Sequence, residues 1–298
     1  MDPSRARIVG IGLMCLGISM FALNDAMGKW LLASYSVGQL LVVRSVAALT
    51  VLTPAMLSEG RALLHPPHPG LQAVRVALST VEVAMFYWAV SVMPLAETTT
   101  FWLAVPIYVA VLAGPMLGER IPLRRWVAIL VGFGGVVLAV NPGGAGLGWP
   151  VLIAFSGSLA FAFMMIVTRH LRGTSDTTLV AWQTLAALIG GLALLPFEGW
   201  KPTGWRDLVL LSILGVIAML AHVATNRSLK LAPASVVVPY QYTIIVWAVT
   251  IGWLVFGDVP AMTTIIGALI IIAAGVWIFW DEARAGQEAL AETEEIKW

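Results

Sequence analysis

Long apolar runs follow one another along the chain and show no period-two alternation. A helix that crosses the hydrocarbon of a membrane needs about 20 apolar residues, whereas the strands of a membrane barrel alternate apolar and polar positions. The runs therefore predict an all-α integral membrane protein. Ten transmembrane helices are expected, near residues 8–33, 37–57, 71–92, 98–116, 123–140, 150–168, 177–196, 207–226, 234–256 and 262–280.

Composition supports this interpretation. Hydrophobic residues make up 59% of the 298 residues and charged residues 11%, against about 25% charged in an average soluble domain. The first run is longer than the core of a signal peptide, so we expect it to stay as the first helix. Cys15 is the only cysteine, so neither an internal disulfide nor a cysteine metal cluster is possible in one chain. The sequence implies no cofactor.

Lysine and arginine are unequally shared between the two sides of the predicted bundle. Short loops rich in these residues stay in the cytoplasm, which predicts cytoplasmic N- and C-termini in a bacterial inner membrane. The opposite side then holds only Lys201 and Arg206, and Lys29 and Arg44 lie within helices. The net charge of +1 gives no reason to expect a nucleic-acid partner. The thirteen cytoplasmic residues are Arg5, Arg7, Arg61, Arg75, Arg120, Arg124, Arg125, Arg169, Arg172, Arg227, Lys230, Arg284 and Lys297.

The second half of the chain repeats the first at a constant offset of 139 residues. Each half holds five predicted helices, and because five is odd the second half must enter the membrane from the opposite side. Inverted repeats of this kind are typical of alternating-access carriers. We expect one repeat over residues 1–141, a second over 142–281 and an acidic cytoplasmic tail over 282–298. The offset matches Ser36 with Ser175, Leu40 with Leu179, Ala47–Leu49 with Ala186–Leu188, Pro94 with Pro233, Gly118 with Gly257 and Glu119 with Asp258.

Several motifs in this order resemble the drug/metabolite transporter superfamily, EamA type, over nearly the whole chain. They are Arg44 in VVRSVAAL of the second helix, the prolines that lead the fourth and ninth helices, and the GER and GD signatures at 118–120 and 257–258. The resemblance implies an exporter of amino acids, other metabolites or cationic drugs, with a central cavity between the repeats. The aromatic residues are similar to those of the YddG-like branch, which exports aromatic and other hydrophobic amino acids. One departure is Gln183, which stands where the first repeat has Arg44.

Ionisable residues inside helices are costly in a membrane and invite functional hypotheses. Asp25 and Arg44 lie at matched depths on either side of a hairpin turn near Tyr35, so we expect them to form an intramembrane charge pair. The alternative is that Asp25 pairs with Lys29 at i, i+4 and that Arg44 only braces helix contacts.

Glu82 and His222 fall near the midplane at almost equivalent positions of the two halves. His222 shares one helical face with Thr225 and Asn226, and a polar stripe in a membrane must face protein or a water-filled cavity. We expect Glu82, His222 and Asn226 to bind the solute or to couple its movement to protons. The alternative for each is that the side chain only packs between helices, with its hydrogen bonds satisfied there.

Aromatic residues follow the matched prolines. Phe101 and Trp102 correspond to Tyr240 and Gln241, and rings beside an amide suit an apolar solute or a cation. We therefore expect these four residues to line the cavity, although many of the thirteen tryptophans belong to interfacial belts.

Other classes of function fit the sequence less well. The four histidines form no HExxH, no GxSxG elbow is present, and no glycine loop of the dinucleotide type occurs, so an enzyme is not expected. A channel is the remaining alternative. The expected partners are a small-molecule solute and the lipid bilayer, and the oligomeric state is left open.

Overall fold

The computed structural model describes residues 3–117, 123–140, 148–171, 173–231 and 238–295, and within them all regular structure is helical. The GER signature at 118–120 lies outside the described residues. The helices are α1 Pro3–Leu32, α2 Val37–Glu59, α3 Arg61–Leu64, α4 Pro69–Val92, α5 Leu95–Leu103, α6 Val105–Leu117, α7 Leu123–Val140, α8 Trp149–His170, α9 Asp176–Glu198, α10 Trp205–Leu231, η1 Val238–Thr243, α12 Ile244–Phe256 and α13 Met262–Glu295.

The described helices confirm the predicted all-α membrane fold. Six of them, α1, α2, α4, α8, α9 and α10, are long and apolar enough to cross a bilayer on their own. The other expected spans correspond to α7, to α13 and to two broken helices, α5 with α6 and η1 with α12. The short helix α3 belongs to the connection between α2 and α4.

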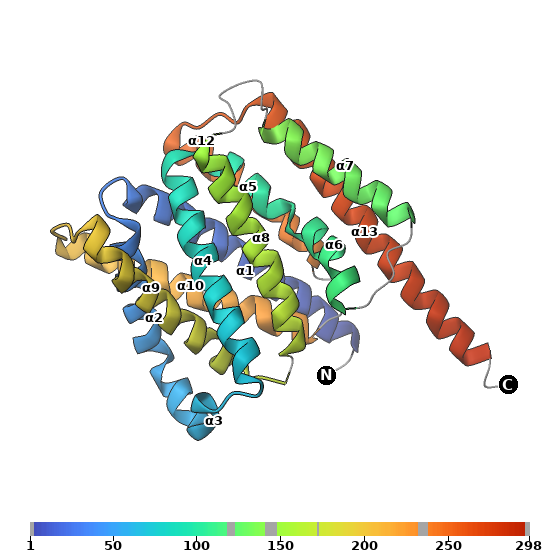
Figure 1. Ribbon diagram of the computed structural model, residues 1–298, viewed down its shortest axis with the longest axis horizontal. Coiled ribbons are helices and arrows are strands. Elements are labelled where there is room, and N and C mark those ends of the chain that lie inside the picture. The colour runs from blue at the N-terminus through green and yellow to red at the C-terminus, as the bar shows by residue number, and fades with distance from the viewer. Residues whose placement is uncertain (1–2, 118–122, 141–147, 172, 232–237, 296–298) are drawn as a thin grey trace.

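Helix packing follows the inverted repeat. The repeat relates α1 to α8 and α4 to α10. In Figure 1, α1 lies beside α10 and α4 beside α8, so these two contacts are equivalent under the repeat. The remaining contacts, α2 with α9, α5 with α12 and α7 with α13, each join a helix to its own counterpart in the other half. These contacts are the ones expected from a pseudo-twofold axis in the membrane plane.

The pair α2 and α9 shows how local sequence positions the halves. Each helix begins at a serine N-cap, Ser36 or Ser175, whose hydroxyl accepts a hydrogen bond from the backbone N–H three residues later. The two helices then approach closely, since a Cβ added to Gly38 would lie 3.0 Å from the carbonyl oxygen of Gly191. Small residues permit such backbone contact in a membrane.

The outer surface of the bundle is apolar, as a bilayer requires. Phe197, Leu123 and Leu130 are 87%, 81% and 68% exposed. Helix α13 has 34 residues and is therefore about 50 Å long, more than the roughly 30 Å of hydrocarbon. Its acidic end projects beyond the bundle in Figure 1 and stays helical as far as Glu295.

Candidate functional site

Two membrane-spanning segments are interrupted at equivalent positions. Helix α5 ends before Ala104, and η1 gives way to α12 at Thr243, which is 139 residues later. Pro106 has no N–H to donate, which weakens helical hydrogen bonding at the first break. Matched interruptions in the two halves of a carrier point to its binding region, because unwound backbone offers polar groups inside the membrane.

A small cavity of about 50 Å³ lies between α2, α4, α9 and α10. It has room for a few water molecules, whereas a metabolite site needs several hundred Å³, so this conformation is closed. Three residues predicted from the sequence, Arg44, Glu82 and His222, line it. The complete lining is Arg44, Ser45, Ala48, Ser79, Glu82, Val83, Gln183, Thr184, Ala187, Gly215, Ala218, Met219 and His222. A larger hollow on α10, around Ser212, opens among apolar side chains on the outer face of the bundle.

Glu82 and Trp102 meet at the edge of this cavity. The indole Nε1–H of Trp102, on α5, donates to Glu82 Oε1 across 2.9 Å. Phe86 packs edge-on against the Trp102 ring at 4.9 Å, and a Cβ added to Gly157 would lie 3.1 Å from it. The tryptophan beside the helix break is therefore held in place by α4 and α8.

Arg44 contacts Tyr87 rather than Asp25. Arg44 Nη1 donates to the Tyr87 hydroxyl at 2.6 Å, the hydroxyl donates to Asn24 Oδ1 at 2.9 Å, and Asn24 Nδ2 donates to the Leu214 carbonyl at 2.7 Å. The direct Asp25–Arg44 ion pair is not formed in the described chain. Asn24, which is 3% exposed, takes this place in the hydrogen-bonded chain, and Asp25 lies close enough to Arg44 and Glu82 to interact with both electrostatically.

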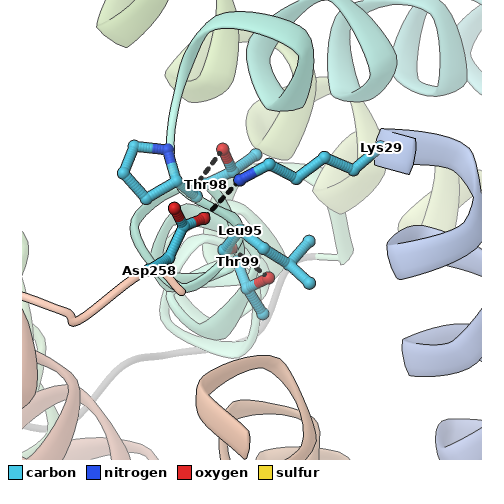
Figure 2. A network of polar contacts seen from close by, with 6 residues as sticks. Lys29, Leu95, Thr98, Thr99 and Asp258 are labelled. Atoms are coloured by element: carbon cyan, nitrogen blue, oxygen red, sulfur yellow. Dashed lines mark hydrogen bonds and ion pairs between the residues drawn. The ribbon is translucent and has the colours of Figure 1, made fainter. Parts of the chain in front are cut away.

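Lys29 also departs from the sequence-based alternative, because its partner is Asp258 and not Asp25. The ammonium lies 2.5 Å from Asp258 Oδ2 and 4.7 Å from the centre of the Phe256 ring. Figure 2 shows this pair beside α5, where the hydroxyls of Thr98 and Thr99 donate to carbonyls one turn earlier. The pair joins α1 to the connection between α12 and α13. We call this end of the bundle the Lys29 end.

Arg75 lies at the opposite end, where α4 and α9 begin and α8 finishes; we call this the Arg75 end. Its side chain is only 4% exposed and lies inside the bundle, in the first turns of the span expected at 71–92. Arg75 Nε donates to Thr168 Oγ1 at 2.8 Å, Nη1 to the Leu179 carbonyl at 3.2 Å and Nη2 to Gln183 Oε1 at 3.2 Å. Gln183 Nε2 in turn lies 3.2 Å from His222 Nε2 in the cavity wall.

Four of the predicted residues lie away from this cavity. Phe101 is 4% exposed and packs in the hydrophobic core around α6 and α8, while Tyr240 is 37% exposed at η1. Asn226 and Gln241 are not among the residues that line the cavity. The structure therefore brings together Glu82, Trp102 and His222 with Arg44, and leaves Phe101, Asn226, Tyr240 and Gln241 apart from them.

Comparison with known proteins decides the family. The model of the EamA-like transporter family matches residues 8–141 and 148–280. The chain belongs to that family. It is a multi-pass membrane transporter of small molecules and not an enzyme.

Named relatives carry different solutes in different directions. The chain is 24% identical over 286 residues to an S-adenosylmethionine uptake transporter of Rickettsia bellii, covering 95% of this chain and 98% of the relative. It is 28% identical over 290 residues to a riboflavin transporter of Rhizobium johnstonii, covering 95% and 94%. It is 25% identical over 267 residues to the pseudopaline exporter CntI of Pseudomonas aeruginosa, covering 89% and 94%.

A solved structure supports the fold of this EamA-like transporter. A protein crystal structure superposes with a TM-score of 0.60 at 16% identity, over 91% of this chain and 95% of the other. Among the described residues of the transporter, no group of three or more His, Cys, Asp or Glu side chains is arranged to hold a metal ion.

Sequence reasoning missed one readable signal in the transporter. Gln72, Arg75, Ser79 and Glu82 recur at i, i+3, i+7 and i+10, which places them on one face of α4. The first three are at most 4% exposed, and the last two line the cavity. This face forms a polar stripe from the Arg75 end to the centre. Tyr87 and Asn24 had no such signal, because their partners lie on other helices.

Proposed function

We propose that the transporter is an alternating-access carrier that exports hydrophobic or aromatic amino acids. One observation carries the proposal: Arg44, Glu82 and His222 line the same cavity, and Trp102 is hydrogen-bonded to Glu82 beside a broken helix. The cavity lies between helices of both halves, which is where inverted-repeat carriers bind their solutes.

The polar groups of the cavity match those of an amino acid. An ammonium group would bind to the Glu82 carboxylate, and a carboxylate would bind to Arg44 through charge-assisted hydrogen bonds. Trp102 and Phe86 offer ring faces and edges for an apolar or aromatic side chain. Opening of the bundle is required, since the closed cavity of about 50 Å³ is smaller than any amino acid.

An exporter of organic cations is the second candidate. The Glu82–Trp102 pair alone would serve a cation, through a carboxylate and a ring quadrupole, with Arg44 only bracing Tyr87. The two candidates differ in their need for the arginine. Replacing Arg44 should abolish transport of an amino acid and leave transport of a cationic dye unchanged.

Counterflow of labelled L-tryptophan into liposomes tests the proposal, with amino acids and cationic dyes as competitors. Saturable counterflow would also separate a carrier from a channel. Glu82→Gln should lower the rate at least about tenfold, the effect of one lost charge-assisted hydrogen bond, and Trp102→Ala should weaken competition by aromatic solutes most. Glu59→Gln, at the end of α2, and Trp149→Ala, at an exposed position, are matched controls outside the cavity that should behave as wild type.

Folding of every variant is checked by its thermal unfolding in detergent. If Glu82→Gln, Trp102→Ala and His222→Ala all fold and carry hydrophobic amino acids at wild-type rates, these residues only pack the bundle. Counterflow of dyes but not of amino acids would replace the proposal by the second candidate.

A further inference from the structure

Two buried polar side chains at the Arg75 end, Arg75 and Gln72, lack the partners that would stabilise them best. The acceptors of Arg75 are a hydroxyl, a carbonyl and an amide, all of them neutral. Gln72, one turn earlier on the same face of α4, is 2% exposed, and neither its Nε2 nor its Oε1 has a hydrogen-bond partner. A guanidinium is stabilised best by an anion, and an amide left without a partner is costly to bury.

The geometry points to a carboxylate-binding site formed by Arg75 and Gln72. A guanidinium presents a planar fork that matches the two oxygens of a carboxylate, and the Gln72 amide would add a donor to the same anion. The site lies at the Arg75 end of the polar stripe, whose other end, at Glu82, lines the central cavity. The inference deepens the proposed function and rests on it, because the bound carboxylate would be that of the transported solute, held at Arg75 on its way to or from Arg44 in the central cavity.

Hydrogen-bond polarity connects this site to His222. Arginine can only donate, so Gln183 must turn Oε1 toward Arg75 and its NH₂ group toward His222. His222 Nε2 must then accept, which places the single ring proton on Nδ1. A doubly protonated imidazolium cannot accept a hydrogen bond. Protonation of His222 and the Arg75–Gln183 hydrogen bond therefore exclude each other.

An anion at Arg75 removes this conflict. When a carboxylate takes the place of Gln183 Oε1 on the guanidinium, the amide can rotate and accept a hydrogen bond from a protonated His222. Anion and proton then favour each other's binding, and such coupling is reciprocal. The charged groups around His222 are Arg44 on α2, with Glu82 and Arg75 on α4. Asp25 on α1 interacts electrostatically with two of them, Arg44 and Glu82.

Acetate serves as a minimal carboxylate probe on the purified full-length protein. We expect acetate to raise the unfolding temperature above that in equal chloride, and to do so more at pH 5.5 than at pH 7.5. Arg75→Gln should lose the acetate effect at both pH values. His222→Gln should keep an acetate effect that no longer depends on pH. Arg206→Gln, which removes an exposed arginine, is the matched control and should behave as wild type.

Gln72→Leu keeps the test decisive if Arg75→Gln does not fold. Removing an unpartnered buried amide should raise the unfolding temperature without acetate, while about tenfold more acetate is needed for the same effect. A purely structural residue would not change these two properties in opposite directions. Equal acetate shifts in wild type, Arg75→Gln and Gln72→Leu would overturn the site, as would stabilisation by inorganic phosphate but not by acetate. Unchanged pH dependence in His222→Gln would overturn the coupling. The measurement needs no transport, so its failure is distinguishable from failure of the counterflow assay.

Discussion

The Lys29 end and the Arg75 end occupy equivalent places in the two inverted halves, yet different chemistry joins the halves at each. At the Lys29 end the acceptors between the halves include carboxylates: Asp258 binds Lys29, Asp207 accepts from the Tyr35 hydroxyl at 2.6 Å and Glu198 accepts from Gly38 N at 2.7 Å. At the Arg75 end, Arg75, Trp182 and Ser228 donate to neutral acceptors across the halves, and one ion pair in the described part of the chain, Arg124 Nε with Asp281 Oδ1 at 2.5 Å, also joins them.

The offset of 139 residues makes the difference explicit. Tyr35 corresponds to Thr174, and whereas the tyrosine hydroxyl is hydrogen-bonded to Asp207, the buried threonine hydroxyl has no partner. Gln39 binds the backbone of Lys201 and the hydroxyl of Thr203, but its counterpart Thr178 lies at a helix cap. The pseudo-symmetry of the backbone therefore does not imply that the same side-chain contacts hold the two halves together at both ends. We infer from the described side chains that opening the Arg75 end breaks fewer contacts to carboxylates than opening the Lys29 end does.

The largest expected effect concerns which side of the membrane each end faces. The bias of lysine and arginine predicts a cytoplasmic Arg75 end. Single cysteines at Ala62 and Pro202, with Cys15 replaced by serine, mark the two ends on exposed positions. An impermeant maleimide should label Pro202→Cys in intact cells and Ala62→Cys only after lysis. The reverse pattern would assign the tighter closure to the cytoplasmic side.

The ion pair of the Lys29 end should give the next largest effect. Asp258→Ala removes the ion-pair partner of an ammonium that is 17% exposed and leaves it only the electrostatic interaction with Glu97, so we expect a loss of about 1–3 kcal/mol, between the values for exposed and buried pairs. The Lys29→Ala, Asp258→Ala double variant should lose less than the single Asp258→Ala. Reversible unfolding of both variants measures this difference. Additive losses would show that the pair contributes no coupling.

Two tryptophans compare the ends directly. Trp88 Nε1 donates to the Glu198 carboxylate at 3.1 Å, and Trp182 Nε1 donates to the Leu63 carbonyl at 2.8 Å. Trp88→Phe should cost about 1.5 kcal/mol and Trp182→Phe about 1 kcal/mol, because hydrogen bonds to charged groups are stronger. Equal costs, measured by unfolding in denaturant, would remove the charge-based distinction between the ends.

Tyr35 and Thr174 should respond with opposite signs although they are equivalent in the repeat. Tyr35→Phe removes a donor from Asp207 and should lower the unfolding temperature. Thr174→Val removes a buried hydroxyl without a partner at nearly constant shape and should stabilise by up to about 1 kcal/mol. Destabilisation by Thr174→Val would mean that its hydroxyl is satisfied in solution and that the Arg75 end is better closed than the contacts indicate.

The smallest expected effect is a pH dependence confined to the Lys29 end. The hydrogen bond to Asp207 raises the pKa of Tyr35 above its usual 10, because a tyrosinate would lose that bond and face a carboxylate. A raised pKa in the folded state means that the stabilisation is complete below pH 10 and is lost as the pH rises through the folded value. Wild type should therefore lose more stability than Tyr35→Phe above pH 10. Parallel alkaline profiles would contradict this.

The sequence by itself determined the membrane fold, the inverted repeat and part of the site. Apolar runs without period-two alternation can satisfy their backbone hydrogen bonds in a bilayer only as helices. An odd number of spans in each repeat then requires the second repeat to be inverted. Glu82 and His222 were predicted at the cavity because a midplane charge or imidazole must turn away from lipid. These conclusions depend on local composition and on chain counting, which need no knowledge of which helices touch.

Only the tertiary structure decided the partners. Arg44 reaches Tyr87 and Lys29 reaches Asp258 because side-chain contact depends on how helices rotate and cross, and it is Asn24, beside Asp25 in α1, that joins the hydrogen bonds of Arg44 and Tyr87. Arg75 is buried for a related reason: packing of α4 against α8 and α9 supplies three acceptors that stabilise the buried guanidinium. Those acceptors lie about a hundred residues away along the chain, where no local pattern reveals them.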